Sequence, residues 1–294
     1  MKETEKRNIN SENLDEMTTT EILRVINNED KKVAMAISNS IEDITKAVNI
    51  VVDALKKGNR VFYIGAGTSG RLGVLDASEL VPTYGVDENL FCAIIAGGDI
   101  ALRKAVENAE DDIEKVKEDL NDRDYKKGDV LIGIAASGQT PYVVSGLQYA
   151  KNMGSPTISI SMNENSAISQ FADCPIEINV GAEVITGSTR MKAGTCQKLV
   201  LNMISTAAMV RMGKVYDNYM VDLIATNRKL KDRSVRIVKD ITGCDDLTAK
   251  VTLDEANGNV KVSIVALILD IDVKEAKKRL DQNDGYVRRV INNG

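Results

Sequence analysis

Residues 61–79 read VFYIGAGTSGRLGVLDASE, and the rest of the chain can be arranged around them. Four mostly apolar residues lead into Gly65, Gly67 and Gly70, with two hydroxyl side chains between the last two glycines. An amphipathic run then continues as far as Glu79. This order predicts a strand, a glycine-rich turn and a helix, the arrangement by which open α/β sheets hold anionic ligands at a helix N-terminus.

Similar units follow along the chain. Short apolar runs predict strands at 61–64, 90–95, 130–134, 157–161 and 176–180. The segments between them predict helices at about 69–80, 99–121, 140–152 and 164–172. The alternation indicates an α/β fold with a doubly wound, five-stranded parallel sheet. Ligands bind such sheets outside the carboxyl ends of the strands, so the turns after the first, third and fifth strands are the candidate binding loops.

Helical sequence flanks this region. The first 17 residues are polar and predict a mobile segment or an arm, and apolar spacing from Thr19 to Leu55 then predicts N-terminal helices. Further on, the pattern predicts a helix over about 191–212, a polar-faced one over 216–241, and three short ones after Gly243. We expect three regions: an arm with helices over 1–50, the α/β domain over 51–215, and a connector with a small C-terminal helical subdomain over 216–294.

Composition excludes several classes of partner. With 38 basic and 43 acidic residues the net charge is −5, which argues against a nucleic-acid partner. The N-terminus is too polar for a signal peptide, and no apolar run approaches the ~20 residues of a membrane span. The four cysteines show no CxxC pairing and histidine is absent, which disfavours zinc. We expect a cytoplasmic, reduced protein without a membrane partner, metal or cofactor.

Two more hydroxyl-rich loops follow the third and fifth predicted strands. AASGQTPY at 135–142 opens a helix, and TGSTR at 186–190 brings Arg190 and the nearby Lys192. Helix N-termini with Ser and Thr donors suit a phosphate monoester. Each turn alone is equally well explained as a helix cap, but three at one sheet edge favour a ligand. Arg71 and Arg190 are candidates for neutralising the anion, or for ordinary surface ion pairs.

GAGTSG also matches the GxGxxG pattern of dinucleotide sites, which by itself is a weak signal. A dinucleotide site needs an acidic residue at the end of the second strand, to hold a ribose. Here that strand ends in Ala96-Gly97-Gly98 and the acid, Asp99, is displaced. An NAD-dependent oxidoreductase is therefore the least favoured interpretation.

The paired loops GAGTSG and AASGQT resemble the sugar isomerase (SIS) domain family of phosphosugar-binding modules. Within it, the chain is similar to the N-acetylmuramic acid 6-phosphate etherases from about Thr19 to the C-terminus, and seven stretches carry the likeness. They are GAGTSGRLGVLDASE, IAGG, AVENAED, GIAASGQTPYV, GAEVITGSTRMKAGTCQKLVLNM, VDLIATNRKL and AKKRLDQNDGYVRRV. The resemblance implies cleavage of the lactyl ether of N-acetylmuramic acid 6-phosphate, giving N-acetylglucosamine 6-phosphate and D-lactate in cell-wall recycling.

The resemblance also implies two catalytic glutamates. Glu79 in DASE matches the family's proton donor, and Glu110 in AVENAED matches its second essential acid. The residues alone do not choose among Glu107, Glu110, Asp111 and the adjacent Asp112, and a solvated charge is the simpler interpretation of Glu79. We expect partial burial to raise the pKa of a working acid. The expected substrate contacts are Thr68, Ser69, Ser137, Gly138, Thr140, Ser188, Thr189 and Arg190.

Glu79 lies ten residues beyond Ser69 on one predicted helix, an axial rise of about 15 Å. We therefore expect Glu79 to serve a sugar bound largely by a second subunit, in a homodimer with sites at the interface, as the resemblance also implies. The main alternative is a non-enzymatic phosphosugar sensor, which needs the loops but neither glutamate. An aldose–ketose isomerase is less favoured because many such enzymes open the sugar ring with a histidine.

Overall fold

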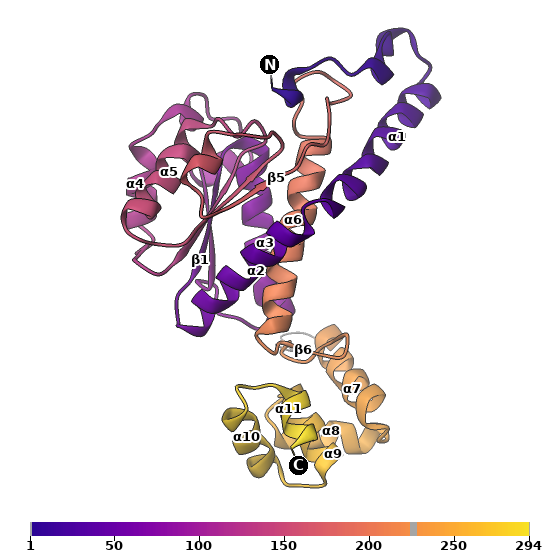
Figure 1. The fold of residues 1–294 in the computed structure, drawn as a ribbon. Coiled ribbons are helices and arrows are strands. Elements are labelled where there is room, and N and C mark those ends of the chain that lie inside the picture. Colours follow the sequence, from indigo (N-terminus) through magenta and orange to yellow (C-terminus); the bar gives the residue numbers. More distant parts are fainter. Residues whose placement is uncertain (1, 224–227, 294) are drawn as a thin grey trace. The chain divides into compact units, whose positions relative to one another are not determined.

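The computed structural model describes residues 2–223 and 228–293. The chain divides into two compact units, the first formed by residues up to 77 and by 88–205, the second by 78–87 and 206–294 (Figure 1). In the part of the chain that is described, no helix is both long and apolar enough to cross a membrane.

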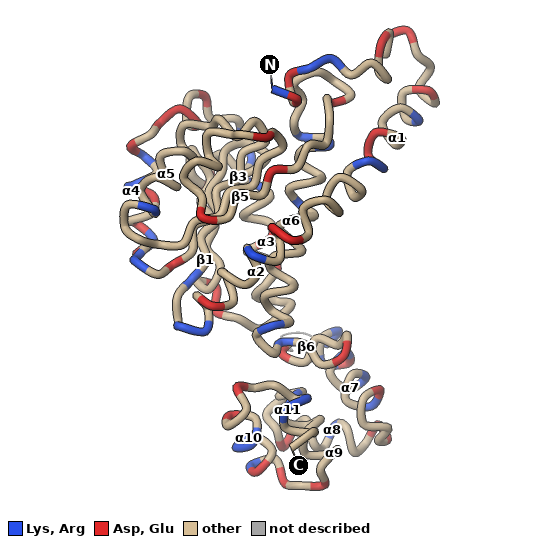
Figure 2. The backbone as a smooth tube through the Cα atoms, viewed as in Figure 1, with Lys and Arg blue, Asp and Glu red and all other residues tan. Residues whose placement is uncertain are grey.

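A five-stranded parallel sheet lies at the centre of the first unit, in the order β2-β1-β3-β4-β5, which confirms the predicted fold class. The strands are β1 (Val61–Gly65), β2 (Phe91–Ile95), β3 (Val130–Ile134), β4 (Thr157–Ser161) and β5 (Cys174–Glu177). They carry a single charged residue, Glu177, whereas the helices and loops carry many (Figure 2). The order reverses between β1 and β3, so the loops after these two strands lie at the switch point where such sheets bind ligands.

Helices cover both faces of this sheet (Figure 1). The helices of this region are α1 (Thr19–Ser38), α2 (Ile41–Lys56), α3 (Gly67–Tyr84), α4 (Lys115–Asn121), α5 (Pro141–Asn152) and α6 (Lys192–Arg211), of which α1 extends away from the sheet. Successive strand residues point to opposite faces, so Phe62 and Ile64 join a buried core with α4 and α5, while Tyr63 contacts α3 at Gly73. α3 and α6 each continue from the first unit into the second.

The predicted helix over 99–121 is mostly wrong. The segment forms 3₁₀ turns at Asp99–Leu102 and Ala109–Asp111 and becomes α-helical only in α4. Gly97, Gly98 and Asn108 have positive φ, which interrupts a helix, and the Arg71 guanidinium binds carbonyl groups that helical bonds would use.

Two smaller predictions also need correction. The helix expected over 164–172 is a single 3₁₀ turn at Ile168–Phe171, because Asn165 has φ 52° and the Glu177 carboxylate binds the N–H groups of Asn165 and Ser166. The polar N-terminal segment forms short 3₁₀ turns, and Thr4 and Asn8 are buried. It is therefore packed against the chain rather than extended as a free arm.

The second unit contains an antiparallel strand pair and several helices around one apolar core. Its elements are β6 (Val215–Tyr216), β7 (Tyr219–Met220), α7 (Arg228–Thr242), α8 (Asp246–Glu255), α9 (Val260–Leu269), α10 (Val273–Gln282) and α11 (Val287–Asn292). The helix predicted from residue 216 is a hairpin at its start, because Asp217 adopts a left-handed turn conformation. The part of that prediction at 224–227 lies outside the described residues.

The C-terminal helical subdomain is confirmed, with one more helix than the three expected after Gly243. Asp284 and Gly285 both have positive φ and separate α10 from the additional α11. α9 is the central helix of this unit, and its first seven residues are buried. The domain boundaries expected at residues 50 and 215 remain predictions.

Candidate functional site

The turn between β1 and α3 is shaped by contacts that only glycine allows. A Cβ atom on Gly70 would lie 2.7 Å from the Gly65 carbonyl oxygen and 2.6 Å from Ile95 Cγ1. Gly67 has φ +53° and open space around it. The glycines therefore bring α3 tightly against the end of β1. As at any helix start, the N–H groups before Gly70 lack intrahelical partners, whereas the Gly70 N–H binds the Ala66 carbonyl at 3.3 Å.

Thr68 and Ser69 in this first turn lie beside α6. A Cβ atom on Gly194 would lie 3.3 Å from Thr68 Cγ2 and 3.6 Å from the Thr189 carbonyl oxygen, so the first and third hydroxyl turns are neighbours. Ser69 is buried, and its Oγ donates to Gln197 Oε1 at 3.0 Å. The tertiary structure thus adds Gln197 to the neighbourhood of the predicted ligand Ser69.

The second turn, between β3 and α5, is held by loop 161–168. Gly138 has φ +68°, and a Cβ atom there would lie 2.3 Å from Ser166 Cβ. Ser137 Oγ accepts the Gln139 N–H at 3.2 Å. Thr140 is the N-cap residue of α5, but its side chain makes no capping bond. Capping therefore does not explain the Thr140 hydroxyl, which is half-buried at the switch point.

The third turn differs from the other two. The Glu183 carboxylate, which is fully buried, accepts the N–H groups of Lys192 and Ala193 at 2.9 Å each. The chain's own anion thus occupies the first turn of α6. Ser188 and Thr189 are half-buried and Arg190 is exposed, so these side chains stay accessible beside a closed helix N-terminus.

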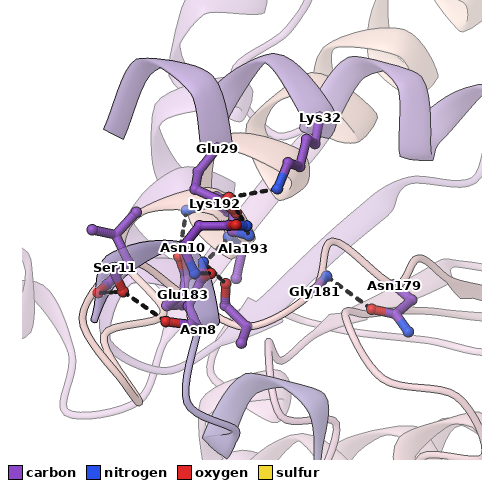
Figure 3. Close-up of polar contacts among 12 residues, drawn as sticks. Asn8, Asn10, Ser11, Glu29, Lys32, Asn179, Gly181, Glu183, Lys192 and Ala193 are labelled. Carbon is purple, nitrogen blue, oxygen red and sulfur yellow. Dashed lines mark hydrogen bonds and ion pairs between the residues drawn. The ribbon is translucent and has the colours of Figure 1, made fainter. Parts of the chain in front are cut away.

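The sequence suggested that Lys192 supplies positive charge to a ligand, but in the structure it pairs with a carboxylate of the chain itself. Its Nζ is buried and lies 2.6 Å from Glu29 Oε2 on α1 (Figure 3). Burial raises the pKa of Glu29, but hydrogen bonds from Lys192, Lys32 and two asparagines outweigh it and lower the pKa to about 2. Asn10 joins the N-terminal segment to this cluster through a 2.9 Å bond to Glu29. The cluster joins the N-terminal segment, α1 and the start of α6.

The segment between β2 and α4, which contains Glu110, is held by α3 and α5. Arg71 Nη2 donates to the Ala101 carbonyl at 2.7 Å, and its Nε donates to that of Leu102 at 3.1 Å. Ser145 Oγ on α5 donates to the Ile113 carbonyl at 2.7 Å, beyond Glu110. In this structure Arg71 therefore holds backbone in place, and its expected role in neutralising an anion stays a prediction.

Both predicted catalytic carboxyl groups are exposed in the single chain. Glu79 lies on α3 and Glu110 lies in the 3₁₀ turn Ala109–Asp111. The expected partial burial is therefore absent, since no part of the chain that the structure describes covers either carboxyl group. Substrate or a second subunit would have to supply the expected burial.

Asp76, one turn before Glu79, forms a buried network. Its carboxylate accepts the Tyr63 hydroxyl at 2.9 Å, Asn202 Nδ2 at 2.7 Å and Ser205 Oγ at 3.1 Å. Burial raises the pKa of Asp76, and these three bonds oppose the rise. The network joins β1, α3 and α6, so Asp76 positions helices rather than forming an open helix-face charge.

Sequence reasoning assigned no role to Gln197 and did not predict the contacts of Arg71 and Asp76. Their partners lie between 13 and 129 positions away along the chain, and no local pattern announces such contacts. Arg71 and Gln197 stand in ordinary helical positions of the stretches GAGTSGR and TCQKLV, so neither stretch signals its contacts.

Two family models match the chain. The glucokinase regulatory protein N-terminal SIS domain matches residues 43–151, and the SIS domain matches residues 112–210. Among solved structures, a phosphoheptose isomerase from Francisella tularensis is 18% identical, covers 66% of this chain and 100% of its own, and has a TM-score of 0.53. A protein from E. coli CFT073 is 20% identical, covers 69% of this chain and 97% of its own, and has a TM-score of 0.51. These structures support the fold.

Curated relatives match almost the whole chain. The N-acetylmuramic acid 6-phosphate etherase of Clostridioides difficile (strain 630) is 52% identical over 288 residues, which are 98% of this chain and 95% of that protein. The etherase of Geobacillus sp. (strain WCH70) is 51% identical over 98% of both chains. The etherase of Actinobacillus pleuropneumoniae serotype 5b (strain L20) is 50% identical over 99% of this chain and 95% of that protein. The chain therefore belongs to the N-acetylmuramic acid 6-phosphate etherase family and carries an SIS domain.

Proposed function

We propose that this protein cleaves the D-lactyl ether of N-acetylmuramic acid 6-phosphate and releases N-acetylglucosamine 6-phosphate and D-lactate, a carbon–oxygen lyase reaction of cell-wall recycling. The observation that carries the proposal is the match to etherases at 52% identity over 98% of the chain. A phosphosugar sensor is less favoured because it would need neither Glu79 nor Glu110, and relatives named etherases match the full length. The proposal includes a cytoplasmic location.

The chemistry begins from the open-chain aldehyde of the sugar. The C2 proton lies next to the carbonyl and is acidified, so its removal allows lactate to leave from C3. Water then adds across the C2–C3 double bond and C2 regains a proton. Each positioned general acid or base accelerates such steps by about 10²–10⁴-fold. Two carboxyl groups satisfy this scheme, and the chain has no histidine to serve instead.

The hydroxyl turns would hold the phosphate and the sugar. Thr68 and Ser69 stand at the first turn of α3, where N–H groups and the helix dipole favour an anion. Ser137, Gly138 and Thr140 stand at the neighbouring turn, since Gly65 of β1 pairs with Ile134 of β3. The third turn would contribute side chains only, from Ser188, Thr189 and Arg190, because Glu183 closes the α6 terminus.

Glu79 and Glu110 would move the protons. Glu79 is proposed to protonate departing lactate, and Glu110 to act as the second acid–base group. Arg71 supports the second role by fixing Ala101 and Leu102, which precede the Glu110 turn, to α3. The exposure of both carboxyl groups favours a site completed by a second subunit, so we propose a homodimer in which Glu79 reaches the partner's sugar.

The activity is tested by measuring D-lactate released from N-acetylmuramic acid 6-phosphate by purified protein. Glu79→Gln and Glu110→Gln should each lower kcat by at least about 100-fold, as expected for the loss of an acid–base group. Glu107→Gln is the matched control, since Glu107 is exposed in the same segment, and it should retain activity. Absence of D-lactate with the unaltered protein would rule out the proposal.

Shared sites are tested by mixing two inactive variants. One is Glu79→Gln and the other carries Ser137→Ala with Thr140→Ala. If each site uses Glu79 from one subunit and the second turn from the other, mixed dimers contain one intact site and regain about a quarter to a half of the activity. No recovery after verified subunit exchange would show that each chain builds its own site.

A further inference from the structure

Gln197 lies directly behind the proposed phosphate-binding hydroxyl. It stands on α6 and is 1% exposed, and its Oε1 accepts the Ser69 hydroxyl at 3.0 Å. Its Nε2 is buried and has no hydrogen-bond partner among the described residues. A buried amide that leaves both N–H donors unused is rare, because such groups normally find an acceptor.

This arrangement gives Ser69 the wrong polarity for binding phosphate. A serine hydroxyl has one hydrogen, and here it is donated inward to Gln197. Only oxygen lone pairs then face outward, and they repel a phosphate oxygen. Ser69 is 7% exposed, so its hydroxyl has enough access to touch a ligand if its hydrogen is released.

Rotation of the Gln197 amide by half a turn reverses the polarity of Ser69 and gives one Nε2 hydrogen a partner. Nε2 then takes the place of Oε1 and donates to Ser69 Oγ, while the carbonyl takes the buried place without a partner. A lone carbonyl is a more common exception in protein interiors than a lone N–H group. The hydrogen of Ser69 is now free to point outward.

We infer that Gln197 is a positioning residue for substrate: its amide donates to Ser69 Oγ, so that the Ser69 hydroxyl donates to a phosphate oxygen of the bound sugar. This inference rests on the proposed function, in which Ser69 contacts the phosphosugar. The chain of bonds runs from Gln197 Nε2–H to Ser69 Oγ and from Ser69 Oγ–H to the phosphate. A glutamine can hold Ser69 in this way because its amide is a neutral hydrogen-bond donor that fits the buried space.

The test compares two substitutions of similar shape. In Gln197→Glu an ionised carboxylate can only accept, so it retains the Ser69 hydrogen and weakens phosphate binding. In Gln197→Met no polar group remains, so Ser69 loses support but keeps its hydrogen available. We expect the dissociation constant for N-acetylglucosamine 6-phosphate, measured by calorimetry, to rise about 10- to 100-fold in Gln197→Glu and about 2- to 10-fold in Gln197→Met.

A double-mutant cycle with Ser69→Ala separates this role from a merely structural one. Once the hydroxyl is absent, Gln197→Glu should weaken binding no further, because its effect passes through Ser69. With substrate, KM should rise more than kcat falls. Gln148→Glu on α5 is the control for an added negative charge, since Gln148 is exposed, and it should bind as the unaltered protein does.

The inference would be overturned if Gln197→Glu and Gln197→Met weakened binding of N-acetylglucosamine 6-phosphate equally. It would also be overturned if Gln197→Glu weakened binding as much in the Ser69→Ala background as in the unaltered protein. If the protein binds N-acetylglucosamine 6-phosphate but releases no D-lactate from N-acetylmuramic acid 6-phosphate, the proposed function is contradicted. The double-mutant cycle then still tests the role of Gln197, because it measures binding alone. No binding of N-acetylglucosamine 6-phosphate by the unaltered protein overturns the role of Gln197 as well.

Discussion

Helix α3 begins within GAGTSG and helix α6 just after TGSTR, two segments of similar composition, but their N-termini have different partners. At α6 the buried Glu183 carboxylate binds the first N–H groups. At α3 no carboxylate bond to the first turn occurs among the described residues, and glycine contacts shape the turn instead. A hydroxyl-rich helix start therefore becomes a candidate anion site only where the chain has not supplied an anion of its own.

The surroundings of the two termini differ as well. Behind α6, the buried Lys192–Glu29 pair fixes the start of the helix to α1. Behind α3, Ser69 meets an amide with an unused donor. One terminus is thus satisfied internally, whereas the other retains hydrogen-bonding capacity for a ligand.

The largest effect on stability is expected at the closed terminus. Lys192→Met removes the buried partner of Glu29 and leaves Lys32 as its remaining ion-pair partner. It should lower the free energy of unfolding by about 1.5–3 kcal/mol, measured by urea denaturation. Lys198→Met is the matched control, since Lys198 is exposed on the same helix. A loss for Lys192→Met no larger than that of the control would contradict a structural role for the pair.

At the open terminus, Gly70→Ala should reduce both stability and activity. The new methyl group would approach the Gly65 carbonyl and Ile95, so the free energy of unfolding should fall by about 1–3 kcal/mol and D-lactate release by at least tenfold. Thermal unfolding and initial rates measure the two effects. Gly67→Asn is the control, because space is open there and asparagine tolerates a positive φ. Similar losses in both variants would argue against a tight turn.

Glu183→Gln tests directly whether the α6 terminus is a closed site. Removing the charge that caps two N–H groups should lower the free energy of unfolding by about 1–2 kcal/mol while leaving KM within about twofold. Denaturation and steady-state kinetics give the two values. A clear fall in KM would mean that phosphate competes with Glu183 for the α6 terminus, and the contrast between the two helices would be lost.

Titration of Glu29 should change the free energy of unfolding only at acidic pH, and near neutral pH it has the smallest expected effect. Its pKa is lowered from 4.5 to about 2 in the folded chain, so the bound carboxylate stabilises the fold fully above pH 4.5. That contribution should disappear progressively as the pH falls from about 4.5 to 2. Urea denaturation across this range should show a shallower loss in Glu29→Gln than in the unaltered protein. Identical pH profiles would contradict the assignment.

Local pattern predicted the fold better than the site. The five strands were recognisable because each is a short apolar run that ends in a turn, and the order of the turns identified the binding edge. The segment after β2 was predicted as a helix because its composition is helical, and tertiary bonds from Arg71 together with glycines at positive φ overrode that preference. The bounds of the last strand also differ, since β5 is Cys174–Glu177 and the strand was predicted over 176–180.

By itself, the sequence determined the sheet, the glycine turns, the hydroxyl side chains at its edge and the family, because these depend on the order of neighbouring residues. Only the tertiary structure decided which helix N-terminus is open, since Glu183 reaches α6 from nine and ten positions away and Gln197 reaches Ser69 from 128. Hydrogen bonding and burial depend on distances between residues that folding brings together. The local sequence therefore predicts an anion site, and long-range packing determines whether a carboxylate of the chain itself occupies it.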